Sequence, residues 1–332
     1  MKTRAFVGDS NKQVKLRDVE IPEPGPDDLA VRTICSGVSI GTESLWLDEN
    51  AKDSNAPIAT GYQAVGVIES TGANVSDFQP GDRVAYRGPA AMTLVESGKP
   101  VTVRNGSHCA NAVFPADWAV PVPEGVDPAP ASLFVMFGTA LHGVDRARPK
   151  LEDWVLVHGC GLIGLAVVAV NALHGCRVIA VDQEPGRLEI AGQLGANHSL
   201  DASNVDIAEE LKGITGGGAD VVFESTGVPA CVPVAANLCR RGATFVYQGN
   251  YGKDTSVEFG FGLAHWYELN MIHTCGPGGN RATETFLKHL ARGTVPWDAV
   301  ITHRHRAEEA EELLDNVLNK RVKDVLGMVI EW

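Results

Sequence analysis

The sequence predicts an α/β protein in which a doubly wound parallel-sheet domain is inserted into a mainly β domain. Residues before 130 are rich in Gly and Pro, and segments from 130 to 275 alternate between strand-like and helix-like patterns. A shorter tail carries further patterns of both kinds. We therefore predict three segments, residues 1–129, 130–275 and 276–332, the last returning to the first domain. The active site is expected in the cleft between the two domains.

Short apolar runs bounded by turn residues predict the strands of the first domain. They include Leu29–Ile34, Ala64–Ile68 and Arg83–Tyr86. Runs of this length between Gly- and Pro-containing turns are typical of a β domain.

Longer patterns predict the second domain and the tail. Helices are expected over Ala131–Arg146, Gly161–Leu173, Arg187–Leu194, Ala282–Arg292 and Ala307–Leu318, and strands over Asp220–Glu224, Ala243–Tyr247, Met271–Thr274, residues 300–302 and Val325–Ile330. The alternation within 130–275 predicts a parallel sheet with helices on both faces.

The range Trp154–Asp182 carries the clearest motif of the chain. It reads as the strand Val155–Val157, the turn Gly159-Cys160-Gly161-Leu162-Ile163-Gly164, a helix, and the strand Val178–Val181 ending at Asp182. This is the spacing and context of a dinucleotide-binding (Rossmann) unit. Gly159 permits the sharp turn, Gly161 lets the backbone approach a pyrophosphate, and Gly164 lets the helix pack on the strand. The helix start adds free N–H groups and a positive dipole end.

Asp182 sets the expected cofactor preference. Its carboxylate can accept hydrogen bonds from the adenosine ribose and would repel a 2′-phosphate, so NAD(H) is favoured over NADP(H). No basic residue follows at 183 or 184. The predicted cofactor site comprises Gly159, Gly161, Leu162, Ile163, Gly164, Asp182, Arg187, Thr226, Gly227 and Gln248.

Composition excludes some classes of partner. A net charge of −13 disfavours nucleic acids and anionic membranes, because both require a basic surface. Residues 154–173 lack Asp, Glu, Lys and Arg, which raises the alternative of a membrane span. The glycines, His158 and the missing basic anchors favour a buried strand and helix instead.

The cysteines and the N-terminus bear on compartment. Seven cysteines are an odd number and form no CxxC pair, so we expect free thiols in a reducing compartment. The apolar run Ala5–Val7 is too short for a secretory signal. We expect a cytoplasmic protein.

Several motifs in a fixed order resemble one family over essentially the whole chain. They are Ile21–Pro26, Ser36-Gly37-Val38-Ser39 with Gly41-Thr42-Glu43, Gly61–Gly66, Pro80–Val84, the glycine turn, Gly195-Ala196, Gly218–Asp220 and Glu224–Gly227. The sequence resembles the medium-chain dehydrogenase/reductase superfamily, whose members combine a GroES-like mainly β catalytic domain with a Rossmann domain. The Ser36–Glu43, Ile301–Arg304 and Met328–Trp332 segments look like the branch that includes bacteriochlorophyllide a dehydrogenase.

The resemblance also shows where this chain departs from zinc alcohol dehydrogenases. The ligand Cys of that group is replaced by Ser39 or, with one inserted residue, Ile40. Its Gly-His-Glu motif reads Gly61-Tyr62-Gln63, and the third ligand position falls near Val135. Ser, Tyr, Gln and Val do not hold Zn²⁺ at neutral pH. The structural-zinc cysteines are missing as well, since residues 86–107 contain none. We expect no metal.

Without zinc, hydrogen-bond donors must polarise the reacting oxygen. Tyr62 is the leading proton donor, although it could instead fill the space left by the metal. Thr42 matches the proton-relay hydroxyl of the zinc relatives, and Ser39 and Gln63 could complete a polar cradle or serve as turn residues. His108, on a loop that resembles a substrate-pocket loop, is a weaker candidate.

Three further candidates are weighed against ordinary structural roles. His142 could line the cleft or lie on the surface. The cluster His265–Glu268 could shape a pocket or pack between domains. Cys35 has no evident activating partner in the sequence, which makes a nucleophilic role improbable.

The leading function is a zinc-independent, NAD(H)-dependent dehydrogenase that interconverts a secondary alcohol and a ketone by hydride transfer. An NAD(P)H-dependent quinone or enoyl reductase is the enzymatic alternative, and a dinucleotide-binding protein without turnover is the non-enzymatic one. We expect a small-molecule substrate and a homo-oligomer, either a dimer or a tetramer.

Overall fold

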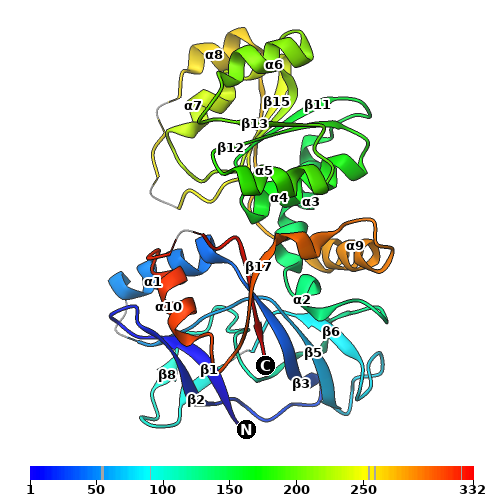
Figure 1. Ribbon diagram of the computed structural model, residues 1–332. Coiled ribbons are helices and arrows are strands. Elements are labelled where there is room, and N and C mark those ends of the chain that lie inside the picture. Colours follow the sequence, from blue (N-terminus) through cyan, green and yellow to red (C-terminus); the bar gives the residue numbers. More distant parts are fainter. Residues whose placement is uncertain (54–55, 90, 253–254, 258, 323) are drawn as a thin grey trace. The chain divides into compact units, whose positions relative to one another are not determined.

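The computed structural model describes residues 1–332 except 54–55, 90, 253–254, 258 and 323. The chain forms two compact units (Figure 1). Unit 1 comprises Met1–Phe134, Thr283–Thr294 and Ile301–Trp332, and unit 2 comprises Val135–Ala282 and Val295–Val300. Unit 2 is thus inserted into unit 1, and the C-terminal segment belongs to the first unit.

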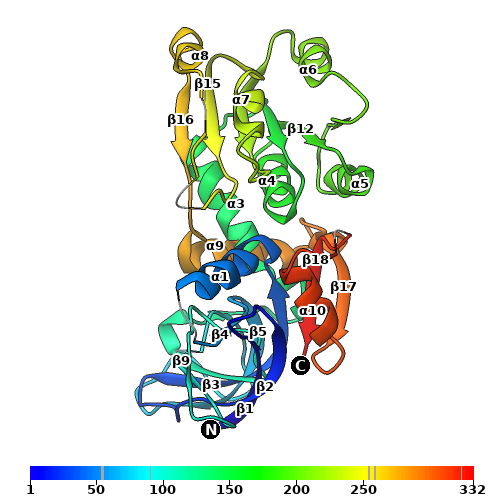
Figure 2. The ribbon, with the colours of Figure 1, turned by 90° about the vertical axis from the view of Figure 1, so that its left-hand side faces the viewer.

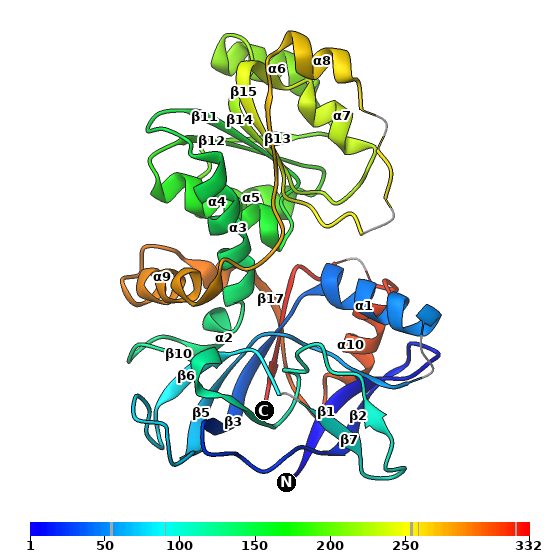
Figure 3. The same ribbon diagram turned by 180° about the vertical axis from the view of Figure 1, so that it is seen from behind.

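Unit 1 is built on two mainly antiparallel sheets (Figure 3). The first has the order β4-β1-β2-β7-β8, with bounds Ile58–Ala59, Lys2–Gly8, Val14–Glu20, Met92–Leu94 and Pro100–Val101. The second has the order β10-β6-β5-β3-β18-β17, with bounds Val120–Pro121, Arg83–Tyr86, Ala64–Thr71, Asp28–Val38, Gly327–Glu331 and Ile301–Arg306, and β9 (Asn111–Pro115) pairs with β3.

The C-terminal strands are integral to the second sheet. β18 pairs antiparallel with β3, from Met328 opposite Val38 to Glu331 opposite Cys35, and parallel with β17. Helix α10 (Glu311–Leu318) buries Leu314 and Val317 in the core of unit 1 and contacts α1 (Ile40–Asp53), as Figure 2 shows. The other helical segments are α2 (Pro128–Ala131), η1 (Ala116–Trp118) and α9 (Gly279–Ala291), which begins in unit 2.

Unit 2 is a parallel sheet in the order β13-β12-β11-β14-β15-β16. Its strands are His198–Asp201, Arg177–Asp182, Trp154–His158, Ala219–Glu224, Cys239–Tyr247 and Asn270–His273. One face is covered by α6 (Ile207–Thr215), α7 (Cys231–Ala236) and α8 (Phe261–Trp266), and the other by α3 (Phe134–Ala147), α4 (Leu162–Leu173) and α5 (Pro185–Gln193). The chain reverses direction across the sheet at β11 and β14, which is the doubly wound arrangement. The short helix η2 (Trp297–Val300) completes the unit.

The predicted fold class is confirmed, and several element bounds need correction. The helix expected over Ala131–Arg146 consists of α2 and α3, separated at Ser132, whose N–H and hydroxyl both bond to backbone carbonyls of α2. The tail helix begins at Glu311 because Ala307 N–H donates to Glu331 O of β18. The sequence interpretation missed helix α1 altogether.

The alternative of a membrane span finds no support in the helices. Helix α4 is only 12 residues long. Across the described ranges, no helix combines the length and apolarity that crossing a bilayer requires.

Candidate functional site

The glycine turn of unit 2 is shaped by close backbone packing. Gly159, after β11, has φ +95°, and a Cβ there would lie 2.9 Å from Thr226 N. A Cβ at Gly164 would collide with Gly159 O. A Cβ at Gly161 would meet nothing within 4 Å. Two of the glycines are therefore required by the fold, whereas the third leaves an open space beside the backbone.

Gly161 is also the N-cap of helix α4 and provides no side-chain cap for the first-turn N–H groups. Leu162 and Ile163 are half-buried residues of that first turn. An uncapped helix start beside an open backbone can receive a phosphate group. The geometry thus fits the pyrophosphate role that the sequence predicts for this turn.

Asp182, at the end of β12, ties three backbone groups together. Its Oδ2 accepts from Cys160 N at 2.6 Å, and its Oδ1 accepts from Gln183 N at 2.8 Å and Glu184 N at 3.0 Å. Arg187 Nη1 lies 3.7 Å from Oδ2. The carboxylate therefore fixes the glycine turn against β12. The sequence interpretation named Arg187 as a cofactor residue, but it anticipated neither this structural role of Asp182 nor the ion pair between the two residues.

The remaining predicted cofactor residues follow β14 and β15. Thr226 donates its N–H and its hydroxyl to Glu224 Oε1, and Gly227 has φ +70°. The Gln248 amide is engaged at both ends, since Nε2 donates to Thr139 O at 3.3 Å and Oε1 accepts from Thr274 Oγ1 at 3.2 Å. Its side chain is thus used for packing, which the sequence did not indicate.

A group of metal-ligand type also lies at these strand ends. His158, Glu224 and Cys231 each offer one ligand atom, and the three atoms lie within 4.8 Å of one another. Glu224 is fully buried, and its Oε2 has no hydrogen-bond partner among the described residues. This group was not anticipated from the sequence.

In unit 1 the candidate catalytic residues gather around Tyr62. Tyr62 is 5% exposed, and the side chains of Ser39 and Thr42 lie close enough to its hydroxyl to act on its pKa. Burial raises the pKa of Tyr62 to about 12, against the opposing effect of those two side chains. The phenol is therefore protonated over the whole neutral range, as a proton donor requires.

Two neighbours flank the Tyr62 ring. The Trp46 ring centroid lies 5.4 Å away, and the Arg87 guanidinium carbon lies 5.6 Å from the Tyr62 centroid. Arg87 Nε also donates to Tyr62 O at 3.2 Å. Neither neighbour was singled out from the sequence.

A buried Glu43 holds the two segments that carry Ser39 and Tyr62. Its Oε1 accepts from Ser39 N at 2.7 Å, and its Oε2 accepts from Gly61 N at 2.9 Å. His108 Nε2 lies 3.1 Å from the same Oε2. A buried carboxylate that accepts from backbone N–H groups of both segments fixes their relative position.

The network continues from His108 to the C-terminus. His108 Nδ1 lies 2.9 Å from Ser36 Oγ, which also accepts from Trp332 Nε1 at 2.9 Å. His108 is fully buried, and the polar groups beside its ring are those of Glu43 and Ser36. Ser36 and Glu43 belong to one segment of the sequence, whereas His108 and Trp332 lie far from it, so the sequence did not indicate this arrangement.

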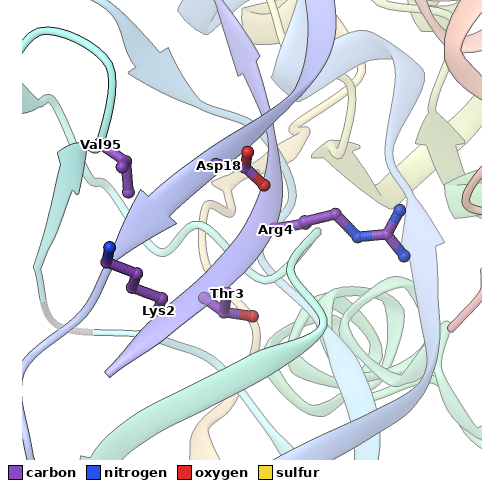
Figure 4. Close-up of a pocket in the computed structure, with 5 residues that line it drawn as sticks. All are labelled: Lys2, Thr3, Arg4, Asp18 and Val95. Atoms are coloured by element: carbon purple, nitrogen blue, oxygen red, sulfur yellow. The ribbon is translucent and has the colours of Figure 1, made fainter.

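A separate pocket lies on β1 and β2, lined by Lys2, Thr3, Arg4, Asp18 and Val95 (Figure 4). None of the predicted site residues lines it. Arg4 is ion-paired with Glu308 at 2.6 Å. We assign it no part in the site.

Comparisons with known proteins match both units. Residues 25–124 match the family described as alcohol dehydrogenase GroES-like domain, and residues 163–292 match zinc-binding dehydrogenase. Together these matches span most of the chain. The chain belongs to the medium-chain dehydrogenase/reductase superfamily.

Individual members of the superfamily match along almost the whole chain. Erythritol/L-threitol dehydrogenase of Mycolicibacterium smegmatis is 28% identical over 95% of this chain and 94% of the relative. L-galactonate-5-dehydrogenase of Escherichia coli is 29% identical over 93% and 94%. These similarities support an alcohol dehydrogenase-like oxidoreductase.

A solved structure of the superfamily has the same fold. The crystal structure of a zinc-binding dehydrogenase from Sinorhizobium meliloti, bound to NADP, is 25% identical, with a TM-score of 0.86 and coverage of 100% of both chains. It therefore supports the fold throughout the chain.

The residues at the zinc-ligand positions of the superfamily do not suit a metal. The Ser39 side chain lies beside the Tyr62 hydroxyl, and the raised pKa of Tyr62 keeps it from becoming a phenolate ligand. Val135, in α3, is a buried hydrocarbon side chain. These donors do not fit Zn²⁺, and we derive no step through a metal.

The other candidates differ in burial. Gln63 is fully buried, and its backbone carbonyl accepts a hydrogen bond from Gly37 N. Cys35 is 3% exposed, and burial raises the pKa of its thiol to about 12, which makes it unreactive. His142 is half-buried in α3, and His265–Glu268 is exposed on and after α8. All seven cysteines are free thiols.

Proposed function

We propose that this chain is a zinc-independent, NAD(H)-dependent dehydrogenase that interconverts a secondary alcohol and a ketone. The observation that carries the proposal is the buried Tyr62 hydroxyl, which stands where zinc relatives place a ligand and has the side chains of Ser39 and Thr42 beside it. A positioned phenol can polarise a carbonyl oxygen and supply its proton.

The proposed role of each hydroxyl follows from hydrogen-bond capacity. A phenol has one O–H donor and can accept two hydrogen bonds. When Ser39 and Thr42 both donate to Tyr62, its own O–H is left to donate to the ketone oxygen. The nicotinamide ring, when bound, supplies the hydride. After the proton has moved to the new alcohol, the two hydroxyls stabilise the phenolate until it is reprotonated.

The preference for NAD(H) rests on Asp182. A 2′-phosphate near this carboxylate would meet a negative charge, whereas ribose hydroxyls would meet a hydrogen-bond acceptor. Arg187 acts against the preference for NAD(H), because its guanidinium lies beside Asp182 and could pair with a 2′-phosphate.

Replacing Asp182 with Ser tests this preference. We expect kcat/KM with NADPH relative to NADH to rise by about tenfold or more, because a repulsive charge is removed while Arg187 remains. Steady-state kinetics with both nucleotides measure it. Wild-type protein that already works better with NADPH would contradict the assignment.

We also propose a homo-oligomer formed through β16 and α8. β16 ends the order of the unit 2 sheet, and Phe261 and Trp266 nearby are 80% and 78% exposed. An open sheet edge beside exposed aromatic side chains suits pairing with a second copy. Light scattering on wild type and Trp266→Glu would test the proposal, and a monomeric wild type would overturn it.

The function itself is tested by turnover in the presence of a chelator. Purified protein with NADH is assayed on panels of ketones, quinones and enoyl compounds, and its zinc content is measured. We expect ketone reduction that survives the chelator and no stoichiometric zinc. Activity only on quinones or enoyl compounds would favour the alternative reductase function.

If the purified protein contains stoichiometric zinc, the residues that bind it have to be identified. Cys231→Ser separates two explanations, because it removes one ligand of the group His158, Glu224 and Cys231 and leaves Ser39 and Tyr62 intact. Zinc lost in this variant with activity retained would place the metal away from the reaction. Activity that a chelator abolishes and Zn²⁺ restores would overturn the metal-free mechanism.

A further inference from the structure

Arg87 is a half-buried cation whose terminal nitrogens have no partner among the described residues. Its Nε donates to Tyr62 O, but within the part of the chain that the structure describes neither Nη1 nor Nη2 contacts a carboxylate or carbonyl. A guanidinium that is partly removed from water without partners is unfavourable. Burial accordingly lowers the pKa of Arg87.

The other half-buried arginines behave differently. Each places a terminal nitrogen on an oxygen of the protein: Arg17 on Glu96, Arg83 on Pro123 O and Val126 O, Arg187 on Asp182, and Arg240 on Asp220. The chain has 41 acidic and 28 basic residues, so carboxylates that could pair with an arginine are in excess. The unpaired state of Arg87 is therefore specific to its position beside Tyr62.

The position of Arg87 is set by rigid neighbours. It follows β6 directly after Tyr86, a fully buried ring that stacks on Phe114 with centroids 4.6 Å apart and bonds to Thr33 Oγ1 at 2.7 Å. The next residue, Gly88, donates its N–H to Ser107 Oγ at 3.2 Å. Anchored on both sides, the guanidinium is held over the Tyr62 ring.

We infer that Arg87 binds an anionic group, a carboxylate or a phosphate, on the substrate whose reacting oxygen faces Tyr62. Two free terminal nitrogens can hold two oxygens of such a group in a bidentate pair. Because the guanidinium lies over the ring that carries the proposed proton donor, one small molecule can reach both groups. The substrates are then hydroxy acids or hydroxyalkyl phosphates and their keto forms, and this assignment rests on the proposed function.

Matched substrate pairs test the inference. Acetoacetate is compared with its methyl ester, and hydroxyacetone phosphate with hydroxyacetone, so that the carboxylate and the phosphate are tested separately. We expect wild type to favour at least one anionic member by about tenfold or more in kcat/KM. Arg87→Met should lower kcat/KM for that member roughly 10- to 100-fold, mainly through KM, and change the neutral member by less than about threefold. Arg87→Lys keeps the charge but loses the bidentate geometry of the guanidinium. Its kcat/KM for the anionic member should lie between those of wild type and Arg87→Met.

Arg104 offers a matched control. Its guanidinium also lies over an aromatic ring of unit 1, 5.2 Å from the Trp46 centroid, but it is paired with Glu49 at 2.7 Å. Arg104→Met should leave the preference for the anionic substrate unchanged. An equal loss on neutral and anionic members in Arg87→Met, or no charge preference in wild type, would overturn the inference while leaving the proposed dehydrogenase intact.

A binding measurement separates the two proposals. If no ketone is reduced, the proposed function fails, and calorimetric titration of acetoacetate and inorganic phosphate into the protein with NADH still tests Arg87. Binding to wild type that weakens about tenfold or more in Arg87→Met supports the anion site. Equal binding to both proteins, or none to wild type, overturns it.

Discussion

The glycine turn of unit 2 and the Tyr62 cluster of unit 1 are built by different means. The turn consists of backbone atoms, shaped by the packing of Gly159 and Gly164. The Tyr62 cluster consists of side chains, held by Glu43 across two separate segments. A backbone site leaves glycines at fixed spacing in the sequence, whereas a side-chain site depends on partners whose proximity only the fold creates.

If this contrast is right, the largest effect of a small change should come from a side chain. Tyr62→Phe removes one hydroxyl and keeps the ring between Trp46 and Arg87. A positioned proton donor contributes typically about 10²- to 10⁴-fold. We expect kcat to fall by at least about tenfold, with NADH affinity nearly unchanged because the glycine turn belongs to the other unit.

Tyr86→Phe is the matched control. Tyr86 is equally buried in unit 1, and its hydroxyl bonds to Thr33. Deleting this hydroxyl should lower stability by about 1 kcal/mol and leave kcat intact. A normal kcat in Tyr62→Phe would reduce that residue to packing and move the proton role to Thr42 or an ordered water.

A second prediction uses the two kinds of glycine in the turn. Gly161→Ala adds a methyl group where nothing lies within 4 Å, so the free protein should keep its stability. If the dinucleotide approaches the backbone there, its Kd should rise by roughly tenfold or more. Gly164→Ala should instead lower stability as well as affinity, because its Cβ meets Gly159 O.

Gly186 provides the control for this pair. It lies in α5, and a Cβ there also meets nothing within 4 Å. Gly186→Ala should leave NADH affinity unchanged and raise stability by up to about 1 kcal/mol, because Ala is the better helix former. Titration of NADH fluorescence and thermal unfolding measure both quantities. Unchanged affinity in Gly161→Ala would mean that no ligand passes close to that residue.

The same contrast explains what could be predicted from the sequence. The β11–α4–β12 unit and the role of its glycines followed from spacing, because strand, turn and helix are contiguous. Asp182 was placed correctly at the strand end, but its bond to Cys160 N was invisible, since it depends on how the turn folds back. Arg187 was named as a cofactor residue, but its ion pair with Asp182 was missed. Asp182 ends β12 and Arg187 lies in the first turn of α5, so only the fold of the β12–α5 connection brings the two side chains together.

Around Tyr62 the sequence indicated residue types but not their partners. Ser39 and Thr42 were chosen from a resemblance, and the structure brings both to the Tyr62 hydroxyl. Glu43, in the first turn of α1, and Arg87, just after β6, were not chosen as site residues because a single acid or base in a sequence resembles ordinary surface charge. Only burial, together with the contacts of Ser39 N, Gly61 N and His108, distinguishes Glu43 from a solvated acid.

The smallest predicted effect concerns stability at high pH. Burial raises the pKa of Tyr62 from 10.0 to about 12, so in this range the folded state keeps a proton that the unfolded state releases. The free energy of unfolding should therefore fall as pH rises from about 10 to 12, with an upper bound of roughly 2–3 kcal/mol from this one group. Tyr62→Phe removes this contribution. Its stability should decline less steeply with pH than that of wild type over this interval, whereas parallel curves from denaturant titrations would show that the Tyr62 pKa is not raised by folding.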